Sequence, residues 1–90
     1  MNPQNHFGKK VASLRVLAGM SQADMATVLK CTRVSASHIE RSESLEDLST
    51  DMTFRIYYLC QEIRNNVTFD EYAREQAKSL QTLVTDYLRQ

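Results

Sequence analysis

The sequence predicts an all-α fold of five helices. Along most of the 90 residues, apolar side chains recur at spacings of three and four, the period of an amphipathic helix. No segment alternates apolar and polar residues as a half-buried strand would. The chain contains only two glycines and one proline, the residues that most often interrupt helices. We expect a single domain, in which residues 1–66 form four helices and residues 67–90 a fifth.

The first expected helix begins near His6 or Phe7 and ends near Ala18. Apolar side chains on one face make up its buried stripe, namely Phe7, Val11, Leu14 and either Leu17 or Ala18. Gly19 follows directly, and glycine readily takes the left-handed backbone conformation that closes a helix. The spacing therefore predicts a helix with one buried face that ends before Gly19.

The next segment, residues 21–41, predicts two short helices around a tight turn. Ser21 is the expected N-cap of the first helix with Asp24 as its capping-box partner, and Thr32 is the expected N-cap of the second. A polar break that starts at Lys30 separates two runs of apolar residues at helical spacing. These residues are Met25, Ala26, Leu29, Cys31, Ala36 and Ile39. Two helices that share one buried seam in this way form a helix-turn-helix unit.

Residues 42–48 are polar and acidic, which predicts a loop before the fourth helix. Ser49 or Thr50 can cap that helix by accepting a backbone N–H, and the two asparagines at 65–66 predict its end. One face of the fourth helix is expected to lie in the core, formed by Met52, Ile56, Leu59, Cys60 and Ile63.

The last helix has the clearest start in the sequence. Thr68 and Glu71 form a T-x-x-E capping box, and Val67 is expected to contact Tyr72 across it. Apolar residues then recur at helical spacing over about twenty residues, which suits a helix that covers one side of a small core. They are Ala73, Ala77, Leu80, Leu83 or Val84, and Tyr87 or Leu88.

The net charge is zero, but the charges are unevenly distributed. Residues 1–41 carry six basic and two acidic side chains, whereas residues 42–90 carry five basic and nine acidic ones. Such asymmetry predicts a basic binding surface on the first part and a different role for the second.

Several classes of protein are not expected from this sequence. No apolar run is long enough to cross a membrane, and the N-terminus lacks the apolar stretch of a secretory signal, so we expect a cytoplasmic protein. The cysteines and histidines do not have a zinc-site spacing, and Cys31 is interpreted as a small buried hydrophobe. No nucleotide loop, nucleophile motif or supported carboxylate pair is present. We therefore expect no catalytic residues, metal, cofactor or small-molecule ligand.

Five short motifs lie in register, without gaps, in residues 7–41. They are an apolar-glycine start, a leucine-arginine pair, a glycine-apolar-serine-glutamine opening, an apolar-alanine pair and an isoleucine-glutamate-arginine close. In this sequence they read Phe7-Gly8, Leu14-Arg15, Gly19-Met20-Ser21-Gln22, Met25-Ala26 and Ile39-Glu40-Arg41. In these motifs the segment resembles the Cro/C1-type (XRE-like) helix-turn-helix transcriptional regulators. The resemblance implies a lambda-repressor-like DNA-binding domain, here extended by a long C-terminal helix.

Three residues depart from the pattern of that family. Lys30 occupies the tight turn where the family has glycine, and a non-glycine residue in the left-handed conformation costs about 1 kcal/mol. Ala36 replaces a larger aliphatic residue, which reduces the packing beneath the helix after the turn. Ser42 replaces the glycine that follows the glutamate-arginine close.

The resemblance implies that residues 33–41 form a recognition helix for the major groove of DNA. Arg33 can donate two parallel hydrogen bonds to a guanine, and Val34 can contact a thymine methyl group. Residues at both ends of this helix and on the preceding helices are expected to contact phosphates or bases as well. The full set of expected DNA-binding residues is Gln22, Arg33, Val34, Ser35, Ser37, His38, Arg41, Lys9 and Lys10.

Two polar residues outside the recognition helix have expected roles. Gln22 stands at the start of the second helix, where the family uses glutamine to hold a phosphate beside exposed N–H groups. Arg15 has two alternatives, because it can contact a phosphate or form an ion pair with Glu40.

Helix-turn-helix proteins commonly bind two half-sites about 34 Å apart as symmetric dimers, so we expect a homodimer. The last helix is the candidate contact, through Tyr72, Leu80, Leu83, Val84, Tyr87 and Leu88. Alternatively, this stripe folds back on the first and fourth helices and covers Val16, Leu17 and Ala18. The two arrangements are compatible, because the stripe has more than one apolar edge.

The expected function is a sequence-specific DNA-binding transcriptional regulator, a repressor that binds a palindromic operator as a homodimer. The alternative is a protein-interaction module of the same fold, such as an antitoxin or antirepressor, that acts through its acidic C-terminal half. The basic first part of the chain favours DNA, and the zero net charge favours the alternative.

Overall fold

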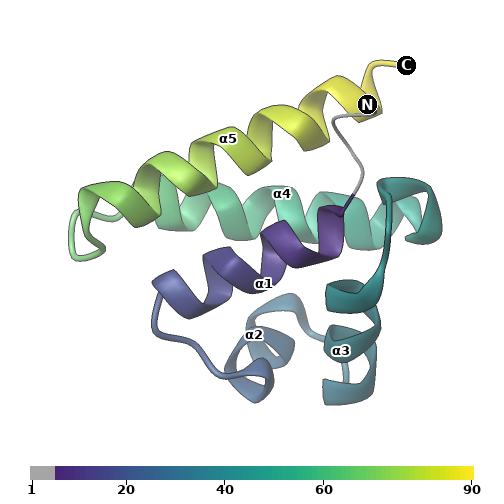
Figure 1. The fold of residues 1–90 in the computed structure, drawn as a ribbon, viewed down its shortest axis with the longest axis horizontal. Helices are drawn as coiled ribbons and strands as arrows, with labels where there is room; N and C mark the ends of the chain where they lie inside the picture. The colour runs from purple at the N-terminus through teal and green to yellow at the C-terminus, as the bar shows by residue number, and fades with distance from the viewer. Residues whose placement is uncertain (1–5) are drawn as a thin grey trace.

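The computed structural model describes residues 6–90, which form five α-helices and one short 3-10 helix and contain no strand (Figure 1). In chain order the elements are α1 (Phe7–Leu17), α2 (Gln22–Leu29), α3 (Arg33–Arg41), the 3-10 helix η1 (Leu45–Asp47), α4 (Thr50–Arg64) and α5 (Glu71–Leu88). The predicted all-α fold of five helices is confirmed. Within this described part of the chain, no helix has the length and apolar character needed to cross a membrane.

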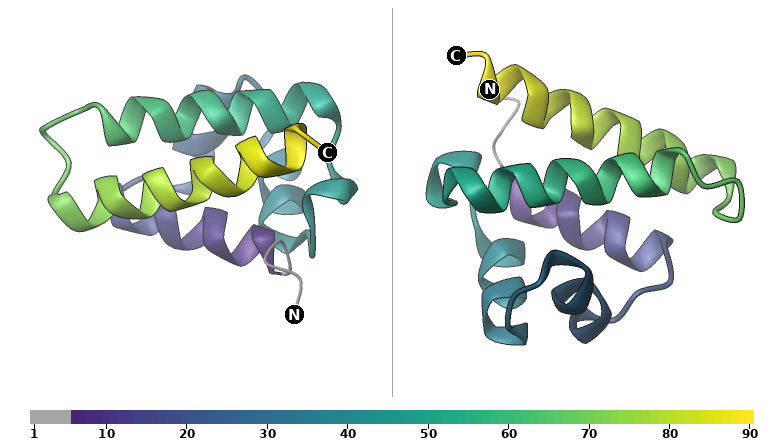
Figure 2. Two further views of the ribbon diagram at one scale, coloured as in Figure 1. Left: turned by 90° about the horizontal axis from the view of Figure 1, so that it is seen from above. Right: turned by 180° about the vertical axis from the view of Figure 1, so that it is seen from behind.

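The helices are arranged so that α2 and α3 lie at one end of the molecule and α5 at the other. α5 packs along α4 and also contacts α1, whereas α3 packs on α1 and α2 (Figure 1). The views in Figure 2 show α1 and α4 as the middle layer between α5 and the α2–α3 pair. The long last helix therefore leaves the outer side of α3 uncovered.

The core consists mainly of residues that the helical spacing predicts. Those that are buried are Phe7, Val11, Leu14, Met25, Ala26, Leu29, Ala36, Ile39, Ile56, Leu59, Cys60, Ile63, Ala73, Ala77, Leu80 and Val84. Cys31 and Met52 are only half-buried at the edge of this core. Leu45 of η1 is fully buried as well, so the segment predicted as a polar loop contributes a core residue through its 3-10 turn.

The start of α5 differs from the predicted capping box. Asp70 is the N-cap, and its Oδ1 accepts the backbone N–H of Ala73 at 2.8 Å. Thr68 lies outside the helix, where its hydroxyl donates to Oδ1 of Asn66 at 2.7 Å. Phe69 is half-buried against the core, and this packing sets the helix start after it. The assignment of Thr68 as the cap is therefore wrong by two residues.

Four apolar residues that were expected to be covered are exposed. Val67 is 81% exposed, and Tyr72 is mostly exposed too, because the later start of α5 moves both out of the positions for an N-terminal contact. Val16 and Leu17 are also exposed, so the last helix does not cover these two residues, although it does fold back on α1 and α4 as the second arrangement expected. Val16 lies on the opposite face of α1 from the buried stripe, and α5 packs on that helix nearer its buried side.

α1 begins against the C-terminal end of α3. The backbone N–H of Phe7 donates to the carbonyl of Glu43 at 3.2 Å, and that of Gly8 donates to Ser42 at 3.0 Å. These bonds satisfy N–H groups that have no partner inside α1. A Cβ atom on Gly8 would lie 2.5 Å from the carbonyl oxygen of Glu40, so the close approach of the two helices requires glycine.

The turn between α2 and α3 forms with the predicted caps. Ser21 and Asp24 make the expected capping box, with both hydrogen bonds at 3.0 Å, and Thr32 caps α3. Lys30 closes α2 in the left-handed conformation, with φ 56° and ψ 47°. The helix-turn-helix geometry is thus preserved although lysine replaces glycine in the turn.

Replacing Lys30 by glycine should stabilise the protein by about 1 kcal/mol, because glycine adopts a positive φ without steric cost. Thermal unfolding should show a midpoint raised by roughly 4–8 °C. The matched control is Lys78→Gly, at an exposed position within α5, which should lower stability by about 1 kcal/mol. Equal effects of the two substitutions would contradict the strain assigned to Lys30.

Candidate nucleic-acid interface

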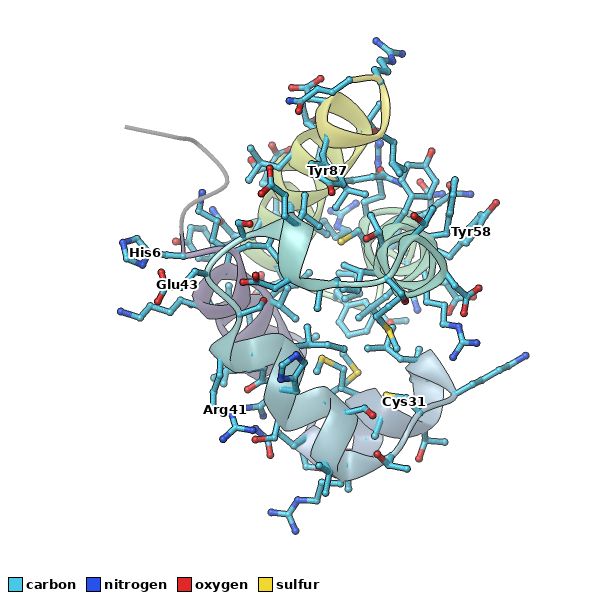
Figure 3. All side chains as sticks on the ribbon, turned by 90° about the vertical axis from the view of Figure 1, so that its right-hand side faces the viewer. His6, Cys31, Arg41, Glu43, Tyr58 and Tyr87 are labelled. Atoms are coloured by element: carbon cyan, nitrogen blue, oxygen red, sulfur yellow. The ribbon has the colours of Figure 1, made fainter. Side chains whose placement is uncertain are left out.

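One face of α3 is anchored in the core and the other is exposed. Ala36 and Ile39 are buried, and the hydroxyl of Thr32 accepts the backbone N–H of Ser35 at 3.0 Å to fix the start of the helix. The exposed side chains, called the α3 surface below, are Arg33, Val34, His38 and Arg41. Figure 3 shows Arg41 extending away from the body of the molecule.

The charges of α3 are separated between its two faces. Glu40 provides its one carboxylate, and that side chain is only 8% exposed and paired with Arg15. The α3 surface itself carries two arginines and a histidine but no carboxylate. Val34, beside Arg33 in the first turn of α3, is 76% exposed. Cations around an exposed methyl-bearing side chain can contact both phosphate oxygens and the edges of bases.

A polar cluster holds α3 against α1 and α2. Nε and Nη2 of Arg15 donate to the two carboxylate oxygens of Glu40 at 2.6 and 3.3 Å, and Nη1 donates to the carbonyl of Met20 at 2.9 Å. Nε2 of Gln22 donates to Oε1 of Glu40 at 3.2 Å. Of the two alternatives for Arg15, the ion pair with Glu40 is therefore the one that forms. The side chain of Gln22, expected to face a phosphate, also turns toward Glu40.

The two serines of α3 are less accessible than the α3 surface. Ser35 and Ser37 are both half-buried. The hydroxyl of Ser35 accepts a hydrogen bond from the hydroxyl of Thr32 at 3.1 Å, so it is part of the N-terminal cap. Within residues 6–90, the hydroxyl of Ser37 forms no hydrogen bond with another protein group, so its exposed part is available to a ligand.

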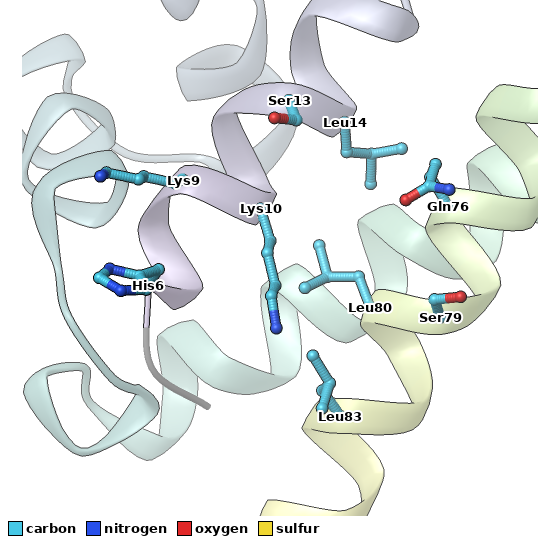
Figure 4. A pocket seen from close by; sticks show the side chains of 9 residues that line it. All are labelled: His6, Lys9, Lys10, Ser13, Leu14, Gln76, Ser79, Leu80 and Leu83. Carbon is cyan, nitrogen blue, oxygen red and sulfur yellow. The ribbon is translucent and has the colours of Figure 1, made fainter. Parts of the chain in front are cut away.

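Lys9 and Lys10 belong to α1 and are not part of the α3 surface. Both are exposed residues of α1 and line a groove between α1 and α5, together with Leu14, Leu80 and other residues (Figure 4). In Figure 4, Lys10 extends along α5 toward Leu83, whereas Lys9 points away from that helix. The structure therefore does not bring Lys10 together with the other residues expected to bind DNA.

A second crevice, between α3 and the start of α4, adds residues that the sequence did not single out. It is lined by Val34, Ser35, His38, Ile39, Arg41, Asp47, Leu48, Ser49 and Met52. Asp47 is held there by backbone N–H groups of Glu43 and Ser44, at 3.1 and 3.3 Å. The sequence signal for this arrangement is the S-x-x-D spacing of Ser44 and Asp47, which forms a capping box for η1.

The residues expected to mediate dimerisation are divided between the core and the surface of α5. Leu80 and Val84 are buried within the single chain. Leu83, Tyr87 and Leu88 are half-buried, and Tyr72 is exposed. Only these last four have surface available to a partner, and dimerisation through α5 stays a prediction.

The two cysteines differ in their expected reactivity. Burial raises the pKa of the Cys60 thiol to about 12, whereas Cys31 is half-exposed beside the turn (Figure 3). In the native protein, a disulfide reagent such as Ellman's should therefore modify Cys31 quickly and Cys60 only on unfolding. A Cys31→Ser variant that still reacts rapidly in its folded form would contradict this.

The raised pKa of Cys60 also makes stability depend on pH. Because the unfolded chain loses the Cys60 proton first, the free energy of unfolding should fall as the pH rises above about 9.

The structure thus unites four of the expected DNA-binding residues on one exposed surface and places the others at its edges or elsewhere. Within residues 6–90, no group of three or more histidine, cysteine or acidic side chains is arranged to hold a metal ion. Comparison of the chain with models of protein families, with curated proteins and with solved structures found no match. What the α3 surface can bind therefore follows from its own geometry and charge.

Proposed function

We propose that the protein is a sequence-specific DNA-binding regulator of transcription that places α3 in the major groove. The observation that supports this most is the division of α3 into an anchored face and an exposed one that bears Arg33, Val34, His38 and Arg41. The major groove of B-DNA, about 12 Å wide, admits an α-helix. The resemblance of residues 7–41 to Cro/C1-type regulators supports the same function, with the action of a repressor.

In this proposal each side chain of the α3 surface has a distinct contact. Arg33, at the N-terminal end of the helix, donates to the O6 and N7 atoms of a guanine. Val34 packs against a thymine methyl group, and Arg41 neutralises a phosphate from the other end. Nε2 of Gln22 has two hydrogens, of which one is engaged by Glu40, so the second can donate to a phosphate.

The proposed active form is a homodimer in the cytoplasm that recognises a palindromic operator. A symmetric pair places one α3 in each of two successive major grooves about 34 Å apart. Bound in this way, the dimer prevents polymerase from occupying the promoter. The exposed parts of Tyr72, Leu83, Tyr87 and Leu88 on α5 are the candidate contact from the sequence pattern.

Binding-site selection from random DNA with the purified protein tests this function, because it yields both the half-site and the spacing. Arg33→Ala should cost about 1–3 kcal/mol of discrimination at one base pair. Arg89→Ala, on the exposed C-terminal end of α5, removes the same charge far from α3 and should leave base preference unchanged. If the protein shows no salt-sensitive DNA binding even at about 50 mM salt, the proposal is wrong and the interaction-module alternative gains support.

A further inference from the structure

Three large apolar side chains are exposed on α2 and α4, with Phe54 one helical turn before Tyr58. Val28 is 48% exposed, Phe54 44% and Tyr58 59%. A crevice of about 590 Å³ runs between the two helices and is lined by Val28, Leu29, Lys30, Arg55, Tyr58, Leu59 and Glu62. Figure 3 shows Tyr58 projecting from α4 on the side of the molecule opposite to His6. Neighbouring exposed apolar side chains of this kind are typical of an interaction surface.

Arg55 links the two helices that carry this surface. Its Nη1 atom donates to the carbonyls of Leu29 and Lys30, both at 3.1 Å, and thereby ties α4 to the C-terminal end of α2. Its Nη2 atom pairs with Asp51 at 2.7 Å. The rings of Tyr57 and Tyr58 meet edge to face with their centroids 5.3 Å apart. A surface ordered in advance loses little conformational entropy when a partner binds.

The charges that line the crevice identify the partner. Arg55 is neutralised by Asp51, which leaves Lys30 from the end of α2 and Glu62 from α4. Neither of these two forms an ion pair within residues 6–90. Across a two-fold axis, if residue i of one copy contacts residue j of the other, then residue j of the first copy also contacts residue i of the second. One cation and one anion on a single patch can therefore pair twice across such an axis.

We infer that the surface formed by Val28, Lys30, Phe54, Tyr58 and Glu62 binds the same surface of a second copy of the chain. Tyr58 lies near the two-fold axis, and Lys30 of one protomer pairs with Glu62 of the partner subunit. The inference does not require DNA binding, because the contact forms in the free protein. This contact is an alternative to the one on α5 for the homodimer, and it shares no residue with the α3 surface, so α3 remains accessible in the associated pair.

Sedimentation velocity without DNA, over a concentration series up to about 200 µM, tests the contact through charge reversal. Lys30→Glu alone and Glu62→Lys alone should each associate at least tenfold more weakly than the wild type, because each brings like charges together. An equimolar mixture of the two variants should recover association as a heterodimer, and so should the double variant as a homodimer. A contact between these two residues gives this pattern, and association that stops at the dimer shows that the contact is two-fold.

Tyr58→Ser should also weaken association at least tenfold, whereas Val16→Ser, at an exposed apolar site on α1, should leave it unchanged. Circular dichroism confirms that each variant is folded. A wild type that remains monomeric throughout the series overturns the inference, and so does a mixture that associates no better than its components. Binding of each variant to a single DNA half-site is measured separately, so failure of the proposed DNA function is distinguished from failure of this contact.

Discussion

Replacing Gly8 by alanine should destabilise the protein by about 3 kcal/mol, although Gly8 lies within a helix. Helix propensity alone predicts the opposite sign, since alanine is favoured over glycine by roughly 0.5–1 kcal/mol in a helix interior. The added Cβ would approach the carbonyl oxygens of Glu40 and Ile39 to 2.5 and 2.6 Å. These are backbone atoms at the end of α3, so relief requires the two helices to move apart.

Chemical denaturation measures this loss of stability. In thermal unfolding, the midpoint should fall by roughly 12–24 °C. Gly19→Ala is the matched control. Gly19 has φ +72° but no atom within 4 Å of a built Cβ, so the substitution should cost only about 1 kcal/mol. If Gly8→Ala is neutral or stabilising, the close approach of α1 to α3 does not exist as described.

Removal of the carboxylate of Glu40 has the second-largest expected effect, about 3 kcal/mol for Glu40→Ala. The side chains of Arg15 and Glu40 are only 17% and 8% exposed, and the substitution leaves the guanidinium without its charged partner. It also removes the acceptor for Gln22. Glu40→Gln keeps the shape and one acceptor oxygen, so it should cost less than half as much.

Urea denaturation of the two Glu40 variants measures these differences. Glu43→Ala is the control, because Glu43 is exposed and its contact with His6 is 3.5 Å long, so its loss should cost less than about 0.5 kcal/mol. If Glu40→Ala were no more damaging than Glu43→Ala, the ion pair with Arg15 would not hold α3 in place. DNA affinity should fall along with stability in Glu40→Ala, since this cluster orients the proposed recognition helix.

Local sequence signals predicted most of the fold because they act within one or two turns of a helix. The capping box of Ser21 and Asp24 depends on residues three apart, and both hydrogen bonds form. The same reasoning was wrong at α5, where Thr68 and Asp70 are both good capping residues. The choice between them is made by Phe69, whose packing against distant helices is not visible in local spacing.

The sequence predicted the part of the candidate site that depends only on which face of a single helix is buried. Helical spacing separates Ala36 and Ile39 from Val34 and Arg41, and the structure places the first pair in the core and the second in solvent. Lys10 depends instead on how α5 packs against α1, which brings the lysine beside Leu83 (Figure 4). Its position could not follow from the sequence of α1 alone.

The junction between α1 and α3 also determines the order in which the chain can complete its structure during synthesis on the ribosome. Phe7 and Gly8 are made early, but the carbonyls that receive their N–H groups belong to Glu43 and Ser42. A nascent chain that has not yet extended past these residues leaves the first turn of α1 without its partners. The N-terminal helix can therefore be secured only after the entire helix-turn-helix has been translated.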